Sequence, residues 1–190
     1  MFSIILLVAV LVVLGILYSA YVSVIQKKNK VKEAFSSINV QLKKRYDLIP
    51  NILTIANKFM EHERSLMEDL TRLRTEVLAT PNNFENIEKK LNLDNEIRNK
   101  MQQLLVSVEN YPQLKSDATM VTAMQTYNEV EEHIAAARRF FNSAVNDLNN
   151  AVEIFPSSLF AKSLGVSTQE YFTVDEKETK SVNAGDYFKK

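Results

Sequence analysis

The sequence predicts an all-α protein, in which an N-terminal transmembrane helix is followed by a long antiparallel helical bundle. Residues 1–25 contain no charged side chain and would be apolar on every face of a helix. The chain has three glycines, and none lies between Ile16 and Leu164. Phosphate-binding loops and tight β-hairpin turns depend on glycine. This long stretch, rich in helix-forming residues, therefore favours helices over sheets.

The apolar run is long enough to span a bilayer. A spanning helix needs about 20 apolar residues, and residues 1–25 would be about 36 Å long at about 1.5 Å per residue. A secretory signal has a basic segment before an apolar core of about 7–15 residues, whereas nothing basic precedes this longer run. Tyr18 and Tyr21 suit the level of the lipid headgroups. We expect an uncleaved anchor, with membrane lipids as partners of residues 1–25.

Lysines predict the orientation of the anchor. Four of them, Lys27, Lys28, Lys30 and Lys32, follow the apolar run, and an excess of lysine marks the cytoplasmic flank of a span. We expect a short N-terminus outside the cell and the main domain in the cytoplasm.

The charge and cysteine counts exclude several classes of function. The chain has 23 basic and 23 acidic residues, so no basic excess indicates a nucleic-acid partner. It has no cysteine, which excludes disulfides, thiolate metal sites and cysteine nucleophiles. This composition agrees with a cytoplasmic domain.

The first of three long helices is predicted to continue directly from the anchor. Apolar residues recur every three or four positions from Val31 to Val77, which forms one stripe along a helix. Pro50 lies inside the stripe, where it removes a backbone donor and clashes with the preceding turn. We favour a kink there, because the stripe keeps its phase. A sharp break that folds the two halves together is the alternative.

A turn at residues 79–83 separates the first helix from the second. Asn82 with Glu85 resembles a capping box, and the second helix carries an apolar stripe over residues 87–108. The Tyr111–Pro112 pair ends this helix.

The third long helix completes the predicted bundle. Ser116 or Asp117 can cap it, its stripe covers residues 120–155, and Pro156 ends it. The short connections predict antiparallel neighbours, and hence a three- or four-helix bundle depending on Pro50.

We divide the chain into an anchor (1–25), a helical bundle (26–156) and a C-terminal extension (157–190). The extension is expected to be partly mobile, from about Asp175 onwards. Its apolar residues are expected to pack back on the bundle: Leu159, Phe160, Leu164, Tyr171 and Phe172.

Charged residues inside or beside the apolar stripes form the candidate site. An unpaired charge on an apolar face costs several kcal/mol, roughly, so these side chains are predicted to pair in an internal polar network. The functional interpretation is a buried catalytic or ion site, but we favour a structural network that fixes helix register. Its predicted members are Arg45, Asp47, Glu63, Glu131 and Arg138.

No catalytic or metal motif supports the enzymatic interpretation. A di-iron carboxylate bundle needs Glu-x-x-His on two helices. The two histidines, His62 and His133, are preceded at that spacing by Phe59 and Val130. We therefore expect no enzyme activity, no metal and no cofactor, and a serine–histidine–acid triad has no supporting motif.

Several runs resemble the LemA family of bacterial membrane proteins. These are N-K-V-K-E-A-F-S-S-I at 29–38, V-Q-L-K-K-R-Y-D-L-I-P-N at 40–51, E-N-Y-P-Q-L-K at 109–115 and R-R-F-F-N at 138–142. Phe35 replaces the family's usual tryptophan, and Phe141 and Leu148 replace its usual tyrosines. The similarity covers roughly residues 20–172, and includes the motif or hinge positions Tyr46, Pro50, Asn51, Tyr111, Pro112, Asn142, Asn149 and Pro156.

The resemblance implies a single-pass protein of the bacterial inner membrane with a cytoplasmic helical bundle. It implies no enzyme activity, cofactor or substrate. We therefore expect a non-enzymatic, membrane-anchored protein that self-associates or scaffolds partners at the cytoplasmic face, as a homo-oligomer or with another membrane protein, because long apolar stripes often find a coiled-coil partner. The alternative is a signal-relay protein that couples the membrane helix to the bundle through a hinge at Pro50.

Overall fold

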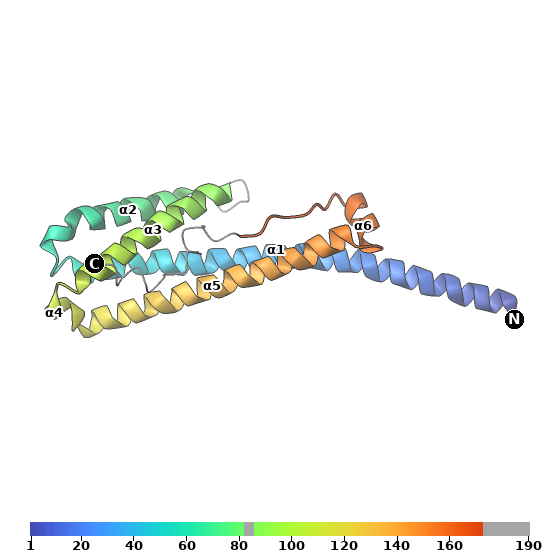
Figure 1. Cartoon of the computed structure of the whole chain (residues 1–190), viewed down its shortest axis with the longest axis horizontal. Coiled ribbons are helices and arrows are strands. Elements are labelled where there is room, and N and C mark those ends of the chain that lie inside the picture. The colour runs from blue at the N-terminus through green and yellow to red at the C-terminus, as the bar shows by residue number, and fades with distance from the viewer. Residues whose placement is uncertain (82–85, 173–190) are drawn as a thin grey trace, which may run out of the picture. The chain divides into compact units, whose positions relative to one another are not determined.

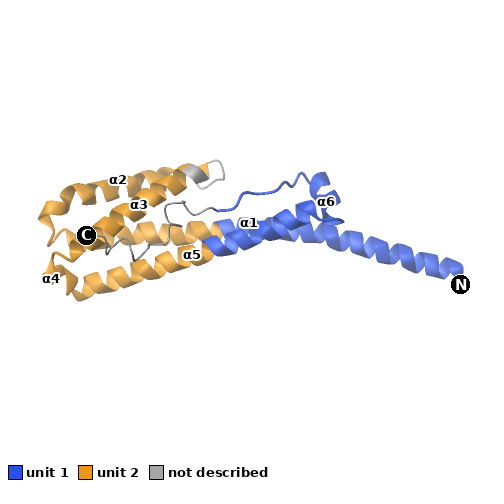
Figure 2. Ribbon diagram, in the orientation of Figure 1, with its two compact units in different colours: residues 1–35, 138–190 blue, residues 36–137 orange. Residues whose placement is uncertain are grey.

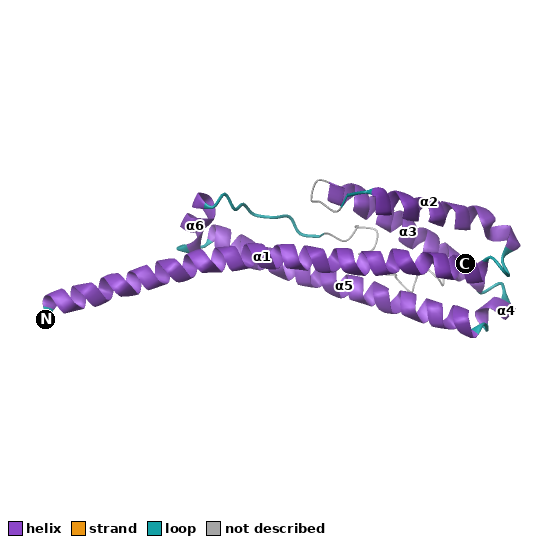
Figure 3. Ribbon diagram, turned by 180° about the vertical axis from the view of Figure 1, so that it is seen from behind, coloured by secondary structure: helices purple, strands orange, loops and turns teal. Residues whose placement is uncertain are grey.

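The computed structural model describes residues 1–81 and 86–172. This part of the chain consists of helices and loops (Figures 1 and 3), so the all-α prediction is confirmed. The helices are α1 (Phe2–Ala56), the 3-10 turn η1 (Glu61–Glu63), α2 (Arg64–Ala79), α3 (Ile87–Val108), α4 (Pro112–Lys115), α5 (Ala118–Glu153) and α6 (Ser157–Ser163).

The chain divides into two compact units (Figure 2). Unit 1 comprises residues 1–35 together with the chain from residue 138 onwards, and unit 2 comprises residues 36–137. Both unit boundaries fall within long helices, since α1 and α5 each contribute to both units. The sequence-based division into 1–25, 26–156 and 157–190 follows the helix pattern instead, and the compact units cut across it.

Unit 2 is a four-helix bundle. The second part of α1, α2, α3 and the first part of α5 run in alternating directions (Figures 1 and 3). Each helix buries residues at spacings of three or four, which is the periodicity of one helix face. The fully or almost fully buried side chains include Ile38, Ile49, Ile52, Leu70, Leu73, Ile97, Met101, Leu104 and Met120.

The first helix continues through Pro50 and ends at Ala56. The chain then turns over residues 57–60, where the Met60 amide donates to the Ala56 carbonyl oxygen at 3.0 Å. The break considered as the alternative therefore does not occur at Pro50. It lies after Ala56, and it allows α2 to return beside α1.

A side chain from α2 compensates for the donor that Pro50 lacks. In a helix the amide of residue 50 would donate to the carbonyl of residue 46, and proline has no amide hydrogen. The Arg74 Nε donates instead to the Tyr46 carbonyl oxygen at 2.8 Å. The helix therefore continues through Pro50, and a residue 28 positions from Tyr46 satisfies the freed acceptor.

Unit 1 packs α6 against parts of α1 and α5. Val24, Ala151 and Ala161 are buried together, with Phe160 and Leu164 packed against them. Of the extension residues expected to pack back, Phe160, Leu164 and Phe172 do so within unit 1. Leu159 and Tyr171 remain exposed.

Two predicted caps have different outcomes. The Asp117 Oδ1 accepts a hydrogen bond from the Met120 amide at 2.9 Å, so Asp117, rather than Ser116, caps α5. The predicted capping box of Asn82 and Glu85 lies outside the described residues, as does the chain from Asp175 onwards.

We predict an energetic coupling between Pro50 and Arg74. Arg74→Met should lower the free energy of unfolding by about 1–3 kcal/mol, because it removes the hydrogen bond that Arg74 donates to the Tyr46 carbonyl. In a Pro50→Ala background the new amide of residue 50 can donate to the Tyr46 carbonyl, so Arg74→Met should cost less there. The two costs of Arg74→Met should differ by a coupling free energy of about 0.5–3 kcal/mol. Denaturation of the four full-length forms in detergent, followed by circular dichroism, measures the cycle.

Arg72→Met is the matched control, because Arg72 lies on the same helix and makes longer, more exposed ion pairs. Its cost should be small and equal in both backgrounds. An Arg74→Met cost that is identical with Pro50 in place and in the Pro50→Ala background would contradict the compensation.

Candidate functional site

A buried ion-pair centre lies at the middle of unit 2. Arg45 on α1 is 1% exposed and pairs through Nη2 with Asp94 on α3, which is also 1% exposed. Its Nη1 donates to the Glu131 Oε1 on α5 at 2.5 Å. The Tyr46 hydroxyl donates to the Asp94 Oδ1 at 2.8 Å. One guanidinium thus joins two carboxylates from two other helices.

The buried Tyr127 on α5 lies close enough to Arg45 and Glu131 for their charges to act on its hydroxyl. Burial raises the pKa of the Tyr127 hydroxyl above its ordinary value, and the Glu131 carboxylate adds to this rise. The hydroxyl therefore stays protonated and neutral throughout the physiological range, and it offers no phenolate base.

The centre combines two of the five predicted network residues and adds one that was not predicted. Arg45 and Glu131 lie together, while Asp94 is the additional carboxylate. The sequence held a signal for Asp94, because it occupies the apolar phase of the second predicted helix, between Leu91 and Ile97.

The other three predicted network residues lie elsewhere. Asp47 is half exposed and pairs with Lys43 at 2.7 Å and with Arg74 at 3.9 Å. Glu63 lies in η1. Arg138 belongs to unit 1, where its guanidinium carbon lies 6.0 Å from the centre of the Phe172 ring.

Three of the motif and hinge positions, Tyr46, Pro50 and Asn51, lie within α1, and the other five lie beside turns or contact the tail. Pro112 is the first residue of α4 and Tyr111 precedes it. Pro156 follows a cis peptide bond before α6. Asn142 and Asn149 on α5 hydrogen-bond the backbone of residues 172 and 169, respectively.

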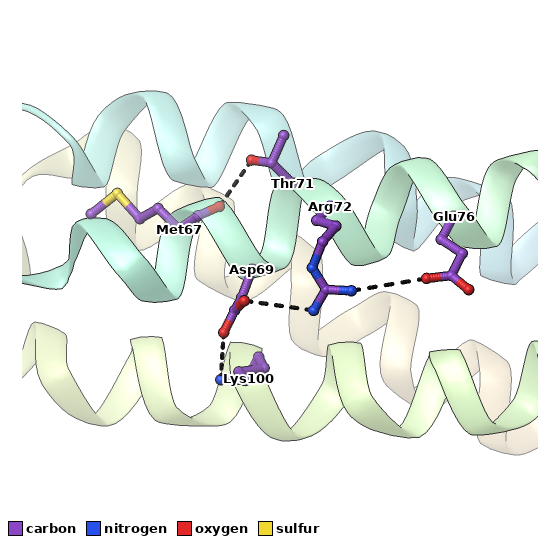
Figure 4. A network of polar contacts seen from close by, with 6 residues as sticks. All are labelled: Met67, Asp69, Thr71, Arg72, Glu76 and Lys100. Carbon is purple, nitrogen blue, oxygen red and sulfur yellow. Dashed lines mark hydrogen bonds and ion pairs between the residues drawn. The ribbon is translucent and has the colours of Figure 1, made fainter.

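A more exposed network joins α2 to α3 (Figure 4). The Lys100 Nζ donates to the Asp69 Oδ2 at 2.7 Å, and Arg72 lies 3.6 Å from the other Asp69 oxygen. The hydrogen bond from Lys100, followed by its charge, lowers the pKa of Asp69 below the ordinary value of 3.8. This network fixes one side of the α2–α3 pair and leaves its members in contact with solvent.

Two open grooves lie between described helices of unit 2, and no residue of the ion-pair centre lines either of them. One, of about 980 Å³, is lined by residues of α1, η1 and α2, including Thr54 and Thr71. The other, of about 670 Å³, is lined by residues of α1 and α5, including Asn51 and Thr122. Within the described residues, no group of three or more His, Asp or Glu side chains could hold a metal ion.

These features define an all-α protein with one N-terminal helix that is long and apolar enough to cross a membrane. The LemA family model matches residues 34–184, and the chain belongs to the LemA family. The match confirms the resemblance; it begins at residue 34 rather than near residue 20, and it extends beyond residue 172, where the similarity was expected to end. A search among curated proteins found no match.

We predict that the ion-pair centre is a stability determinant. Arg45→Met removes the counter-charge of buried Asp94 and should lower the free energy of unfolding by about 3–5 kcal/mol. Glu131→Gln should cost less, because the Glu131 side chain is 29% exposed. Chemical denaturation of the full-length chain in detergent measures both losses.

Lys43→Met is the matched control, since Lys43 lies on the same helix and makes an exposed pair with Asp47. Its expected cost is at most about 1 kcal/mol. If Arg45→Met cost no more than Lys43→Met, the centre would not stabilise the bundle.

Proposed function

We propose that this protein is a non-enzymatic membrane anchor for a helical bundle that self-associates or scaffolds partner proteins at the cytoplasmic face of the bacterial inner membrane. The observation that carries this proposal is the continuity of α1. Its apolar side chains from Phe2 to Ile16 are exposed, and the same helix later supplies one wall of the bundle. Lipid is the solvent in which such an exposed apolar surface is stable.

Other features of unit 1 support a membrane contact at the end of the apolar run. Tyr18 is exposed, and Tyr21 meets Phe160 of α6 edge to face at a centroid distance of 6.0 Å. Ile154 and Phe155, just before α6, are exposed as well. Exposed aromatic and aliphatic side chains beside a span suit the headgroup region, and the lysines from Lys27 onwards favour a cytoplasmic bundle.

The two grooves of unit 2 support a scaffolding role. Threonine hydroxyls in both grooves donate within their own helices, as Thr71 does to the Met67 carbonyl at 2.9 Å and Thr122 to the Ala118 carbonyl at 2.9 Å. The methyl groups and hydroxyl lone pairs then remain for contact with another protein surface. Open grooves between helices accept the side chains of a partner helix.

The proposal predicts discrete crosslinks from the grooves. A photoreactive residue at Thr71 or at Thr122 should capture a second copy or a partner of defined mass in salt-washed native membranes. Val106 is the control position, because it is exposed on α3 and lines neither groove. Equal crosslinking at Val106, or none at the groove positions, would contradict scaffolding through the grooves.

The same membranes test the anchor. Leu7→Arg with Leu11→Arg should release the chain into the salt wash, because each charge at the centre of a span costs about 2.5–3.5 kcal/mol. The matched form with methionine at both positions should stay in the membrane. Release of the unmodified chain by salt alone would contradict anchoring.

The alternative function, signal relay through a hinge at Pro50, is favoured by one contact. The Arg74 Nε on α2 donates to the Tyr46 carbonyl, the acceptor that an amide at position 50 would otherwise serve, so bending there would be coupled to α2. A relay predicts a broad distribution of distances between spin labels at Val40 and Thr54, which Pro50→Ala should narrow. One narrow distribution, identical in both forms, would argue against the hinge.

A further inference from the structure

Two asparagines on one face of α5 hold an extended segment of the same chain. Asn149 Nδ2 donates to the Gln169 carbonyl at 3.0 Å, and its Oδ1 accepts from the Gln169 amide at 2.8 Å. Asn142 makes the same pair of hydrogen bonds with Phe172, at 2.9 and 2.8 Å. We call Asn142 and Asn149 the asparagine clamp, and residues 167–172 the tail segment.

The spacing of the clamp matches an extended backbone. Asn142 and Asn149 are separated by seven helical residues, or about 10.5 Å at a rise of about 1.5 Å per residue. Gln169 and Phe172 are separated by three residues, or about 10 Å at a rise of about 3.3 Å. Each asparagine satisfies both the donor and the acceptor of one residue, as a neighbouring β-strand would. The clamp therefore recognises peptide backbone, whatever the side chains.

An aromatic contact beside the clamp adds side-chain selectivity. The Phe172 ring meets the Phe141 ring edge to face, with centroids 5.1 Å apart, and Arg138 lies 6.0 Å from the Phe172 ring. Phe141 is buried and also contacts Phe35, at a centroid distance of 6.3 Å. A suitable ligand is thus an extended peptide with an aromatic residue three positions after the first clamped residue.

The tail segment is bound at the asparagine clamp without being buried. It has no helical structure, and none of its six residues is buried. The Tyr171 hydroxyl donates a hydrogen bond to the Asn146 Oδ1 at 3.2 Å, yet Tyr171 stays largely exposed. Such a segment can leave and rebind without opening the core of unit 1.

We propose that the asparagine clamp is an extended-peptide binding site, occupied in a single chain by its own tail segment and, in associated chains, by the tail segment of a second copy. The exchange rests on the proposed self-association. A second copy is the occupant that fits the clamp best, because its tail segment can make the same backbone hydrogen bonds and place the same phenylalanine against Phe141. Every contact broken in one chain is remade between chains.

The clamp itself is tested with a free peptide and the full-length chain in detergent micelles. The probe is a fluorescent, end-blocked peptide of residues 164–172, and binding is followed by anisotropy against empty micelles. Gln169→Pro with Phe172→Ala releases the tail, because proline cannot donate to Asn149. This form should bind the probe at least about tenfold more tightly than the wild type, whose site is already occupied.

Substitutions in the released-tail form test the chemistry of the clamp. Asn149→Asp keeps the acceptor but removes the donor, and should weaken binding of the probe. Asn142→Ala with Asn149→Ala should abolish it. Asn150→Ala is the matched control, since Asn150 is an exposed asparagine at the next position, and binding should be unchanged. No binding to the released-tail form, or equal binding to the double alanine form, would overturn the clamp.

Exchange between copies is tested by crosslinking, for which the absence of native cysteine is useful. Full-length Asn146→Cys and full-length Tyr171→Cys are reconstituted together in vesicles and treated with a short bismaleimide. Exchange predicts a covalent dimer that joins the two forms, and adding Gln169→Pro to the second form should remove it. If the peptide binds but no such dimer forms, the exchange is overturned. Scaffolding through the grooves is judged separately, by the crosslinks at Thr71 and Thr122.

Discussion

Arg45 and Tyr46, two consecutive residues of α1, make polar contacts with each of the other long helices of unit 2. Arg45 pairs with Asp94 of α3 and Glu131 of α5, and the Tyr46 carbonyl accepts a hydrogen bond from Arg74 of α2. Apolar packing favours contact between helix faces but tolerates sliding along them. Breaking a buried ion pair costs about 3–5 kcal/mol, and removing the donor of a buried carbonyl costs about 1–3 kcal/mol, so a shift of any neighbour by one turn along α1 would be unfavourable. These contacts therefore set the register of all four helices around one point.

The sequence predicted the elements that depend on local pattern and missed those that depend on distant partners. The stripes placed Arg45 and Glu131 on core-facing phases, and a charge there requires a partner. They could not show that Asp94, rather than Asp47 or Glu63, supplies the second carboxylate, because that depends on how α3 is rotated.

Pro50 is the clearer case. Whether a proline breaks a helix depends on what satisfies the freed carbonyl, and here that group is Arg74, on another helix. Asn142 and Asn149 were marked by the family resemblance, but their ligands are backbone atoms, which leave no side-chain signal.

The tail segment is held by a narrow balance of energies. Its four backbone hydrogen bonds to the clamp contribute about 1 kcal/mol each, and partial burial of the Phe172 ring adds about 2 kcal/mol. Ordering six residues of backbone costs at least about 1 kcal/mol per residue. The two sides agree to within a few kcal/mol, so the bound state of the tail is favoured over the released state by only a modest free energy. A ligand or a second copy needs only a small preference to shift that balance.

The ion-pair centre and the asparagine clamp therefore serve opposite purposes. At the ion-pair centre of unit 2, charge is buried and paired, so its contacts are expensive to break and the helices keep one arrangement. In unit 1, the clamp is only partly buried, and water can replace each of its hydrogen bonds at modest cost when the tail leaves. Segments that bind and release belong to the low-stability part of a structure by necessity. The same amide chemistry would fix the register less firmly in the buried centre, because losing a neutral hydrogen-bond partner there costs about 1–3 kcal/mol, whereas breaking a buried ion pair costs about 3–5 kcal/mol.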